Sequence, residues 1–151
     1  MENNNLRSVF QMVVRRFGFL NERCCESCCG EDVSLVQSHI IYEISRQNEP
    51  SMQDVAGELG LDITTFSRQV KALVAQGLVK KTPHPLDNRV NILSLTAEGK
   101  RIEENINQEM NNYLNQILSH LSEYERESVI RSMTLLDDAM RKSENYCCPP
   151  K

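Results

Sequence analysis

The sequence predicts a mainly α-helical fold with one small β-hairpin. Three observations lead to this prediction. Most of the chain repeats apolar residues at three- and four-residue steps, several of these repeats follow a capping residue, and two short β-like runs flank one turn-rich segment. The length of 151 residues suits a single domain, and the hydrophobic and charged fractions of 40% and 25% are ordinary for a soluble globular protein.

Two helices are predicted in the N-terminal third of the chain. The apolar residues from Leu6 to Leu20 follow a helical repeat, which can continue through the cysteines to a stop at Gly30. A second helix is predicted over residues 34–46. Its inner side would carry Val36, Ile40, Ile41 and Ile44.

Two shorter helices are predicted next, separated by Gly60. Ser51 and Asp54 have the spacing of a capping box before the first of them, and Asp62 is a suitable N-cap for the second. The apolar face of this second helix would consist of Ile63, Phe66, Val70, Leu73 and Val74. Two short helices joined by a glycine turn, the second with a polar and basic outer face, form a helix-turn-helix.

The outer face of this second helix carries residues that suit DNA. On a helical wheel the outermost positions are those of Thr65, Arg68 and Ala72. The flanking positions are those of Thr64, Gln69 and Lys71, while Ser67 lies nearer the buried edge. Threonine and glutamine can hydrogen-bond to base edges, arginine can bind guanine with two hydrogen bonds, and a small alanine lets a helix sink into the major groove. An ordinary surface helix has the same pattern, so the wheel alone does not decide the function.

A hairpin is predicted directly after this helix. Short β-like runs over 78–81 and 90–95 flank the turn-rich residues 82–88. Residues 62–101 contain seven Lys or Arg and three Asp or Glu, a local balance of +4, whereas the whole chain has a net charge of −4. A basic hairpin in this position is a wing that can reach the adjacent minor groove, and a local DNA-facing surface requires such a concentration of positive charge.

From Asp87 onward the chain resembles the MarR family of winged-helix regulators. Residues 87–99 follow the family pattern of Asp-x-Arg, a strand, and Leu-Thr-x-x-Gly opening the next helix. The resemblance is supported by Leu59-Gly60-Leu61-Asp62, Ser67-Arg68 and the run from Leu73 through Gly77-Leu78-Val79. Helix order and length agree over about 6–142. The resemblance implies that Arg89 enters the minor groove and that Asp87 fixes the wing, and a narrow minor groove does attract arginine.

A long helix from Thr96 and a last helix opened by the capping box of Ser122 and Glu125 complete the prediction. Their apolar stripes, over 102–121 and 129–140, are too extensive for a lone subunit, so we expect a homodimer. The single domain 1–151 would divide into a helical dimerisation scaffold, a winged helix-turn-helix and a tail. The scaffold would span 6–49 and 97–143, the winged helix-turn-helix 50–96, and the tail 144–151. Two-fold symmetry predicts an inverted-repeat operator in double-stranded DNA, bound by a transcription repressor.

All six cysteines lie in two clusters. They are Cys24, Cys25, Cys28, Cys29, Cys147 and Cys148. If the first helix continues through the first cluster, its four thiols occupy one side over little more than one turn. In the MarR family the first and last helices meet at the dimer interface, so the resemblance implies that the tail cysteines come within reach of this cluster.

Such grouped thiols suit a thiophilic metal or metalloid that releases the repressor from DNA. Three thiolates suit arsenite, two or three suit copper(I), and four suit zinc or an iron–sulfur cluster. Peroxide or electrophile sensing by a thiolate pair is the redox alternative. A cytosolic metal-binding protein without operator specificity is the alternative of another class.

The sequence contains no constellation that would support an enzyme. It has no Gly-rich phosphate loop, no His-Glu-x-x-His and no Gly-x-Ser-x-Gly element, and His39, His84 and His120 fall on separate predicted elements. No apolar run approaches the ~18 residues that a membrane span requires, and no secretory signal precedes the first helix. We therefore expect a non-enzymatic protein in the cytoplasm.

Overall fold

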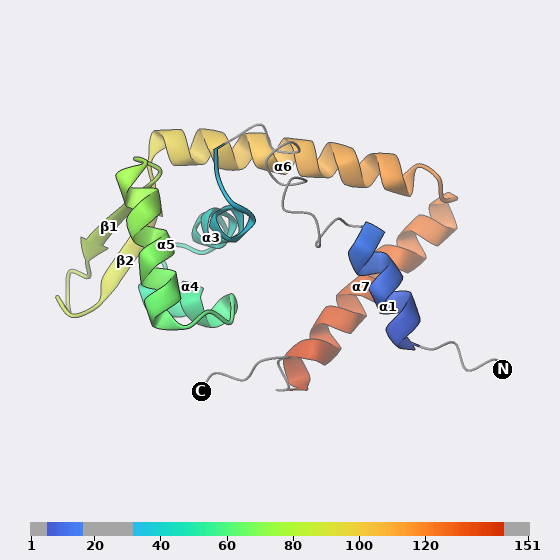
Figure 1. The fold of residues 1–151 in the computed structure, drawn as a ribbon, viewed down its shortest axis with the longest axis horizontal. Coiled ribbons are helices and arrows are strands. Elements are labelled where there is room, and N and C mark those ends of the chain that lie inside the picture. Colours follow the sequence, from blue (N-terminus) through green and yellow to red (C-terminus); the bar gives the residue numbers. More distant parts are fainter. Residues whose placement is uncertain (1–5, 17–31, 144–151) are drawn as a thin grey trace.

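The computed structural model describes residues 6–16 and 32–143, and it has the predicted helical fold with one antiparallel hairpin (Figure 1). The elements are α1 (Leu6–Arg16), α3 (Leu35–Arg46), α4 (Met52–Glu58), α5 (Ile63–Ala75), β1 (Val79–Pro83), β2 (Asn91–Leu95), α6 (Ala97–Leu118) and α7 (Glu123–Lys142). The helix predicted from Leu6 is present as far as Arg16, and its predicted continuation toward Gly30 lies outside the described residues.

One hydrophobic core joins α3, α4, α5, the hairpin and the start of α6. Ile40 and Ile41 of α3, Phe66 of α5 and Leu93 of β2 are completely buried in it. Full burial of side chains of this size stabilises a fold by about 1.5–3 kcal/mol each. Helix α3, which falls in the predicted dimerisation part, therefore packs in the same core as the helix-turn-helix.

The predicted helix starts are present as capping interactions. Ser51 and Asp54 form the capping box of α4, and Ser122 and Glu125 form that of α7. The Asp62 side chain caps α5 by accepting a hydrogen bond from the Thr65 backbone N–H at 2.9 Å. These side chains satisfy donors that the first turn of a helix otherwise leaves without partners.

Three apolar residues predicted on inner helix faces are instead exposed. Val36 of α3 and Ile63 and Val74 of α5 have exposed fractions of 38%, 51% and 41%. In each helix the buried stripe is narrower than the apolar pattern, because only positions on one line of the helix meet the core. The strand bounds also differ from the predicted ranges of 78–81 and 90–95. Strand β1 begins at Val79 and continues to Pro83, and β2 begins at Asn91.

Helices α6 and α7 extend away from the core. In Figure 1, α6 runs from the hairpin to the turn that precedes α7, and α7 then folds back. Only Gly99 and Ile102, both near the start of α6, are buried in that helix, and α7 buries no residue. Leu121, predicted on the apolar stripe of α6, lies beyond the end of this helix.

Many apolar residues on the outer parts of these helices are exposed. They include Met110, Tyr113, Ile117, Val129, Ile130, Met133, Leu136 and Met140. No helix within the described ranges combines the length and apolar character needed to cross a membrane.

Candidate nucleic-acid interface

A tight turn at Gly60 connects the two helices of the helix-turn-helix. Gly60 has a φ of +62°, a left-handed conformation that glycine adopts without steric cost. The Leu61 backbone N–H donates to the Ala56 carbonyl at 3.0 Å, which closes the end of α4. Asp62 follows immediately as the cap of α5, and the hydrogen bonds from Thr65 lower the pKa of its carboxyl below the ordinary value. The turn thereby sets where the second helix begins.

Helix α5 is anchored by one side. Phe66, Val70 and Leu73 are buried against the core. Among the residues proposed to read DNA, Thr64, Arg68 and Lys71 are exposed, and Thr65 and Gln69 are half-buried.

The outward direction of α5 differs from the one predicted. Ser67, predicted near the buried edge, is exposed, whereas Thr65 and Ala72, predicted to point directly outward, are half-buried. The helical wheel took the inward direction of α5 as the mean of five apolar positions, but two of these residues, Ile63 and Val74, do not contact the core closely. The accessible face is therefore turned toward the side of Thr64, Arg68 and Lys71.

The tip of the hairpin is held by local hydrogen bonds. The His84 backbone N–H donates to the Val90 carbonyl at 2.7 Å, and the Val90 N–H donates to the Asp87 carbonyl at 3.0 Å. The His84 Nδ1 atom accepts a hydrogen bond from the Leu86 N–H at 3.1 Å. The tip therefore has an ordered backbone from residue 84 to residue 90.

Asp87 positions Arg89, while the Arg89 side chain projects away from the protein. The Asp87 Oδ1 atom accepts a hydrogen bond from the Arg89 backbone N–H at 3.0 Å and lies 3.8 Å from its Nε. The Arg89 side chain is 95% exposed. An ion pair this exposed contributes about 0–1 kcal/mol. The guanidinium is thus free to leave Asp87 for another anion while the backbone contact remains.

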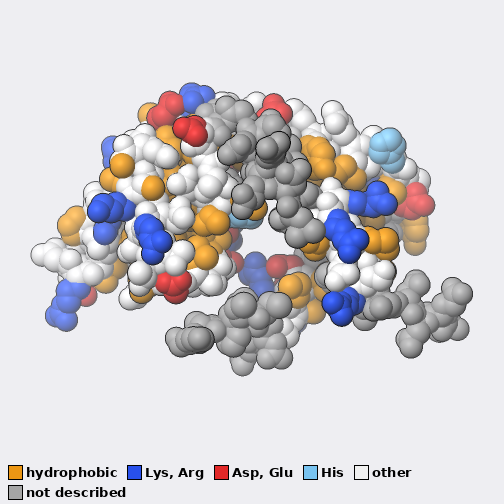
Figure 2. Space-filling view, viewed as in Figure 1, with side chains coloured by type: hydrophobic (Ala, Val, Ile, Leu, Met, Phe, Trp, Pro, Cys, Tyr) orange, Lys and Arg blue, Asp and Glu red, His pale blue; other side chains and the backbone are white. Residues whose placement is uncertain are grey.

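The base of the hairpin is fixed to the core. Val79 pairs with Leu95 and Lys81 pairs with Leu93, and Val79 and Leu93 are buried. The Leu93 N–H also donates to the Pro50 carbonyl at 2.9 Å. Figure 2 shows Lys and Arg side chains spread over the face formed by α5 and the hairpin. This face is therefore basic and rigidly supported.

Thr96 and Gly99 connect the hairpin to the end of α5. The Thr96 N–H donates to the Leu78 carbonyl at 3.0 Å, and its hydroxyl donates to the Gly77 carbonyl at 2.7 Å. The same hydroxyl oxygen accepts the Gly99 N–H at 3.0 Å and so caps α6. The sequence contains both residues in its Leu-Thr-x-x-Gly element, but it does not show that they contact the end of α5. These residues hold α5, the hairpin and α6 in one unit.

The predicted cysteine site cannot be placed. All six cysteines lie outside the described residues. His39 and His120 are exposed and belong to different parts of the chain. Within residues 6–16 and 32–143, no group of three or more His, Cys, Asp or Glu side chains could hold a metal ion. The thiol site therefore stays a prediction.

Comparisons with known proteins match this arrangement. A model of the MarR family matches residues 33–90. The HTH-type transcriptional regulator YdgJ of Bacillus subtilis (strain 168) is 26% identical over 105 residues, covering 70% of this chain and 63% of YdgJ. The HTH-type transcriptional regulator BilQ of Clostridium symbiosum (strain WAL-14163) is 26% identical over 128 residues, covering 85% of this chain and 87% of BilQ. The chain thus spans less than two thirds of the length of YdgJ.

The fold is similar to that of a solved regulator. The crystal structure of Streptococcus pneumoniae FabT in complex with DNA has a TM-score of 0.74 and 22% sequence identity, and the match covers 93% of this chain and 95% of FabT. The segment matched by the family model, 33–90, contains α3, α4, α5, β1 and the hairpin tip, which are elements described above. Residues 33–90 of this chain are therefore similar to the MarR family, and the two relatives named above are HTH-type transcriptional regulators.

Proposed function

We propose that this chain is a homodimeric transcription repressor that binds an inverted-repeat operator and leaves it when its clustered cysteines bind a thiophilic metal or metalloid. The observation that carries the DNA-binding part is the shared core of α5 and the hairpin, which presents the exposed Arg68, Lys71 and Arg89 on one supported unit. FabT, whose fold is similar, has been crystallised with DNA, and this supports the same use of the fold here.

The two elements would contact different grooves. Helix α5 would enter the major groove, where Arg68 can bind guanine with two hydrogen bonds and Thr64 can bond to a base edge. Thr65 and Gln69 would contribute from the half-buried flank. Arg89 would enter the minor groove beside it, with Asp87 fixing its backbone. Lys71 would contact phosphate, which adds affinity without selecting a sequence.

A second copy of the chain is the proposed partner of α6 and α7. Helix α7 buries no residue in a single subunit, although Ile130, Met133 and Met140 have exposed fractions of 49%, 57% and 61%. Contiguous apolar surface of this kind marks an interaction site. A two-fold dimer would place two α5 helices on half-sites about one helical turn apart, roughly 34–36 Å along the DNA.

The proposed inducer acts through the thiolates of the two cysteine clusters, which lie outside the described residues. Soft thiolate ligands select arsenite, copper(I) or zinc over hard cations. A ligand changes DNA affinity only if it binds the two arrangements of the dimer with different affinity, and a coupling of about 1–3 kcal/mol is typical of such regulation. A metal held between Cys24–Cys29 and Cys147–Cys148 would tie together parts of the dimer scaffold and change the separation of the recognition helices.

Selection of genomic DNA fragments by the purified chain tests the DNA-binding part. We expect enrichment of one inverted repeat, and loss of that enrichment in a variant that carries both Arg68→Ala and Arg89→Ala. If the unaltered chain enriches no sequence while it binds metal, the alternative of a metal-binding protein without operator specificity is correct.

A titration of the operator complex tests the inducer. Under anaerobic and reducing conditions we expect release on addition of arsenite, copper(I) or zinc, and no release from a variant with all six cysteines replaced by serine. Release that requires an oxidant and is reversed by a thiol reductant would show redox sensing instead. An unchanged response to every agent in the serine variant would reject both kinds of cysteine sensor.

A further inference from the structure

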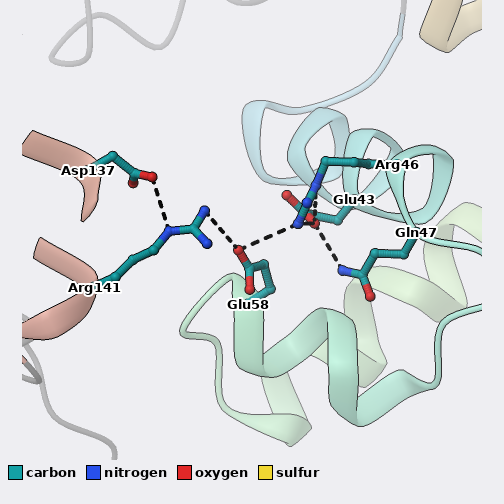
Figure 3. A network of polar contacts seen from close by, with 6 residues as sticks. All are labelled: Glu43, Arg46, Gln47, Glu58, Asp137 and Arg141. Carbon is teal, nitrogen blue, oxygen red and sulfur yellow. Dashed lines mark hydrogen bonds and ion pairs between the residues drawn. The ribbon is translucent and has the colours of Figure 1, made fainter. Parts of the chain in front are cut away.

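A network of side chains with alternating charge crosses from α7 to α4 and α3 (Figure 3). Arg141 Nη2 lies 3.7 Å from Glu58 Oε1, and Arg46 Nη2 lies 3.6 Å from the same oxygen. Arg46 Nη2 also lies 2.8 Å from Glu43 Oε2. One carboxylate oxygen of the helix-turn-helix thus faces two guanidinium groups, one from α3 and one from α7.

Each end of this charge network is fixed by further contacts. On α7, the Arg141 Nε donates to Asp137 Oδ2 at 3.0 Å, which holds the guanidinium toward α4. On α3, Glu43 Oε2 accepts hydrogen bonds from Arg46 and from Gln47 Nε2, the latter at 3.0 Å. Burial would raise the pKa of Glu43, but these hydrogen bonds and the charges of Arg46 and Arg141 outweigh it and hold the pKa below the ordinary value. Glu43 therefore stays a carboxylate that anchors Arg46.

The position of Glu58 is unfavourable for a helix by itself. Glu58 is the last residue of α4, and a negative side chain at a helix C-terminus interacts unfavourably with the helix dipole. Arg141, in the last turn of α7, has the favourable sign for its own helix end. A carboxylate at the end of α4 is therefore better explained by the two cations that it faces than by the stability of α4.

We propose that Arg141 and Glu58 form a latch that sets the angle of the helix-turn-helix relative to α7 and thereby the half-site spacing that the dimer accepts. This inference rests on the proposed dimeric DNA-binding function. Because α7 buries no residue in the subunit, little packing fixes it against α4, and the ion pair of Arg141 with Glu58 can bias that angle. Arg141 is a positioning residue, since it acts through α4 and does not contact DNA.

The test uses the full chain and a set of operators whose half-site spacing is varied by one base pair in each direction. An exposed ion pair changes an equilibrium by roughly two- to fivefold, and a dimer contains the latch twice. We expect Arg141→Gln and Glu58→Gln each to reduce the preference for the best spacing by about fivefold. The double variant should lose no more than Glu58→Gln alone, because that change already removes the contact with Arg141.

Arg131→Gln is the matched control, because it removes the same charge from an exposed position on the same helix. It should leave the spacing preference unchanged. A latch variant whose spacing preference equals that of the unaltered chain, or a double variant whose losses simply add, would overturn the proposal.

Hydrogen exchange on the DNA-free chain separates failure of the latch from failure of the proposed function. We expect faster amide exchange in α4 and in the last turn of α7 for Arg141→Gln and Glu58→Gln, and not for Arg131→Gln. If the unaltered chain binds no operator but this exchange pattern holds, the proposed function is wrong and the contact is real. If exchange is the same in all variants, the latch does not exist, whatever the chain binds.

Discussion

Gly99 faces the backbone carbonyl of Leu78 so closely that a Cβ atom at position 99 would overlap the carbonyl oxygen. That carbonyl also accepts the Thr96 N–H, so the first turn of α6 is pressed against the residue that joins α5 to β1. Glycine is required here by space and not by its backbone angles. The contact determines how closely α6 approaches the hairpin.

Replacing Gly99 with alanine should destabilise the fold. The added methyl group meets backbone, which cannot rotate away, so α6 must shift from the end of α5. Overpacking of this kind costs about 1–3 kcal/mol. Urea unfolding followed by circular dichroism measures the loss. Gly57→Ala is the control, because nothing lies within 4 Å of its added Cβ and alanine favours helix, so this variant should be as stable as the original or up to about 1 kcal/mol more stable.

Replacing Thr96 with valine should loosen the hairpin from α5. Valine keeps the shape but cannot cap α6 or donate to the Gly77 carbonyl. We expect a loss of about 0.5–2 kcal/mol in unfolding free energy, whereas Thr96→Ser should retain most of the stability. Equal stability of the valine and serine variants would mean that the hydroxyl has no structural role.

Arg89→Ala and Arg68→Ala should weaken DNA binding in different ways. If Arg89 enters the minor groove as proposed, its loss removes a cation from that groove, so affinity should fall and the dependence on salt should become shallower. Loss of Arg68 should cost about 1–3 kcal/mol at particular base pairs and relax specificity there. Fluorescence anisotropy with operator variants at several salt concentrations distinguishes the two. Unchanged affinity in both variants would show that another face contacts DNA.

Acid should destabilise the fold through carboxylates that are hydrogen-bonded in it. The pKa of Glu43 is lowered as described above, and hydrogen bonds from Ser51 lower the pKa of Asp54. A carboxyl whose pKa is lower in the folded state stabilises that state above its unfolded pKa of about 4, and this contribution is lost as the pH falls further. Unfolding free energy measured from pH 7 to pH 3 should therefore decline. Glu43→Gln should lower stability at pH 7 and make the decline shallower; an equally steep decline would contradict this assignment.

Met133→Glu should separate the proposed dimer. The side chain lies on the apolar stripe of α7 and is 57% exposed in one subunit, so a charge there would be buried only on association. Light scattering should report a monomer at micromolar concentration. Arg131→Glu lies on the opposite side of α7 by helical geometry and should remain dimeric. A dimeric Met133→Glu protein would place the interface elsewhere.

Local signals in the sequence predict the ends of the elements better than the direction of their faces. The caps at Ser51, Asp62 and Ser122 depend on neighbouring residues, so the sequence alone identifies them. The outward face of α5 depends on which apolar residues meet α3 and the hairpin. Ile63 and Val74 are apolar without meeting them, and counting them turned the predicted face toward Thr65.

Contacts between distant segments could not be predicted. The Leu-Thr-x-x-Gly element is visible in the sequence, but the approach of Gly99 to Leu78 depends on the hairpin that brings them together. The pairing of Arg141 with Glu58 depends on how α7 folds back from α6. Neither follows from periodicity, because both require the packing of elements far apart in the chain.

Helix α6 connects the core around the hairpin and α5 with the apolar surface near α7. Its first turns are buried with the hairpin and α5, while its last turns carry exposed apolar residues. With 22 residues it is about 33 Å long. A rigid rod of that length acts as a lever, and a tilt of about 5° moves its far end by roughly 3 Å. That displacement is close to the ~3.4 Å rise of one base pair. On the proposed dimeric operator complex, a modest repacking at one end of α6 is therefore enough to move α5 out of register with its half-site.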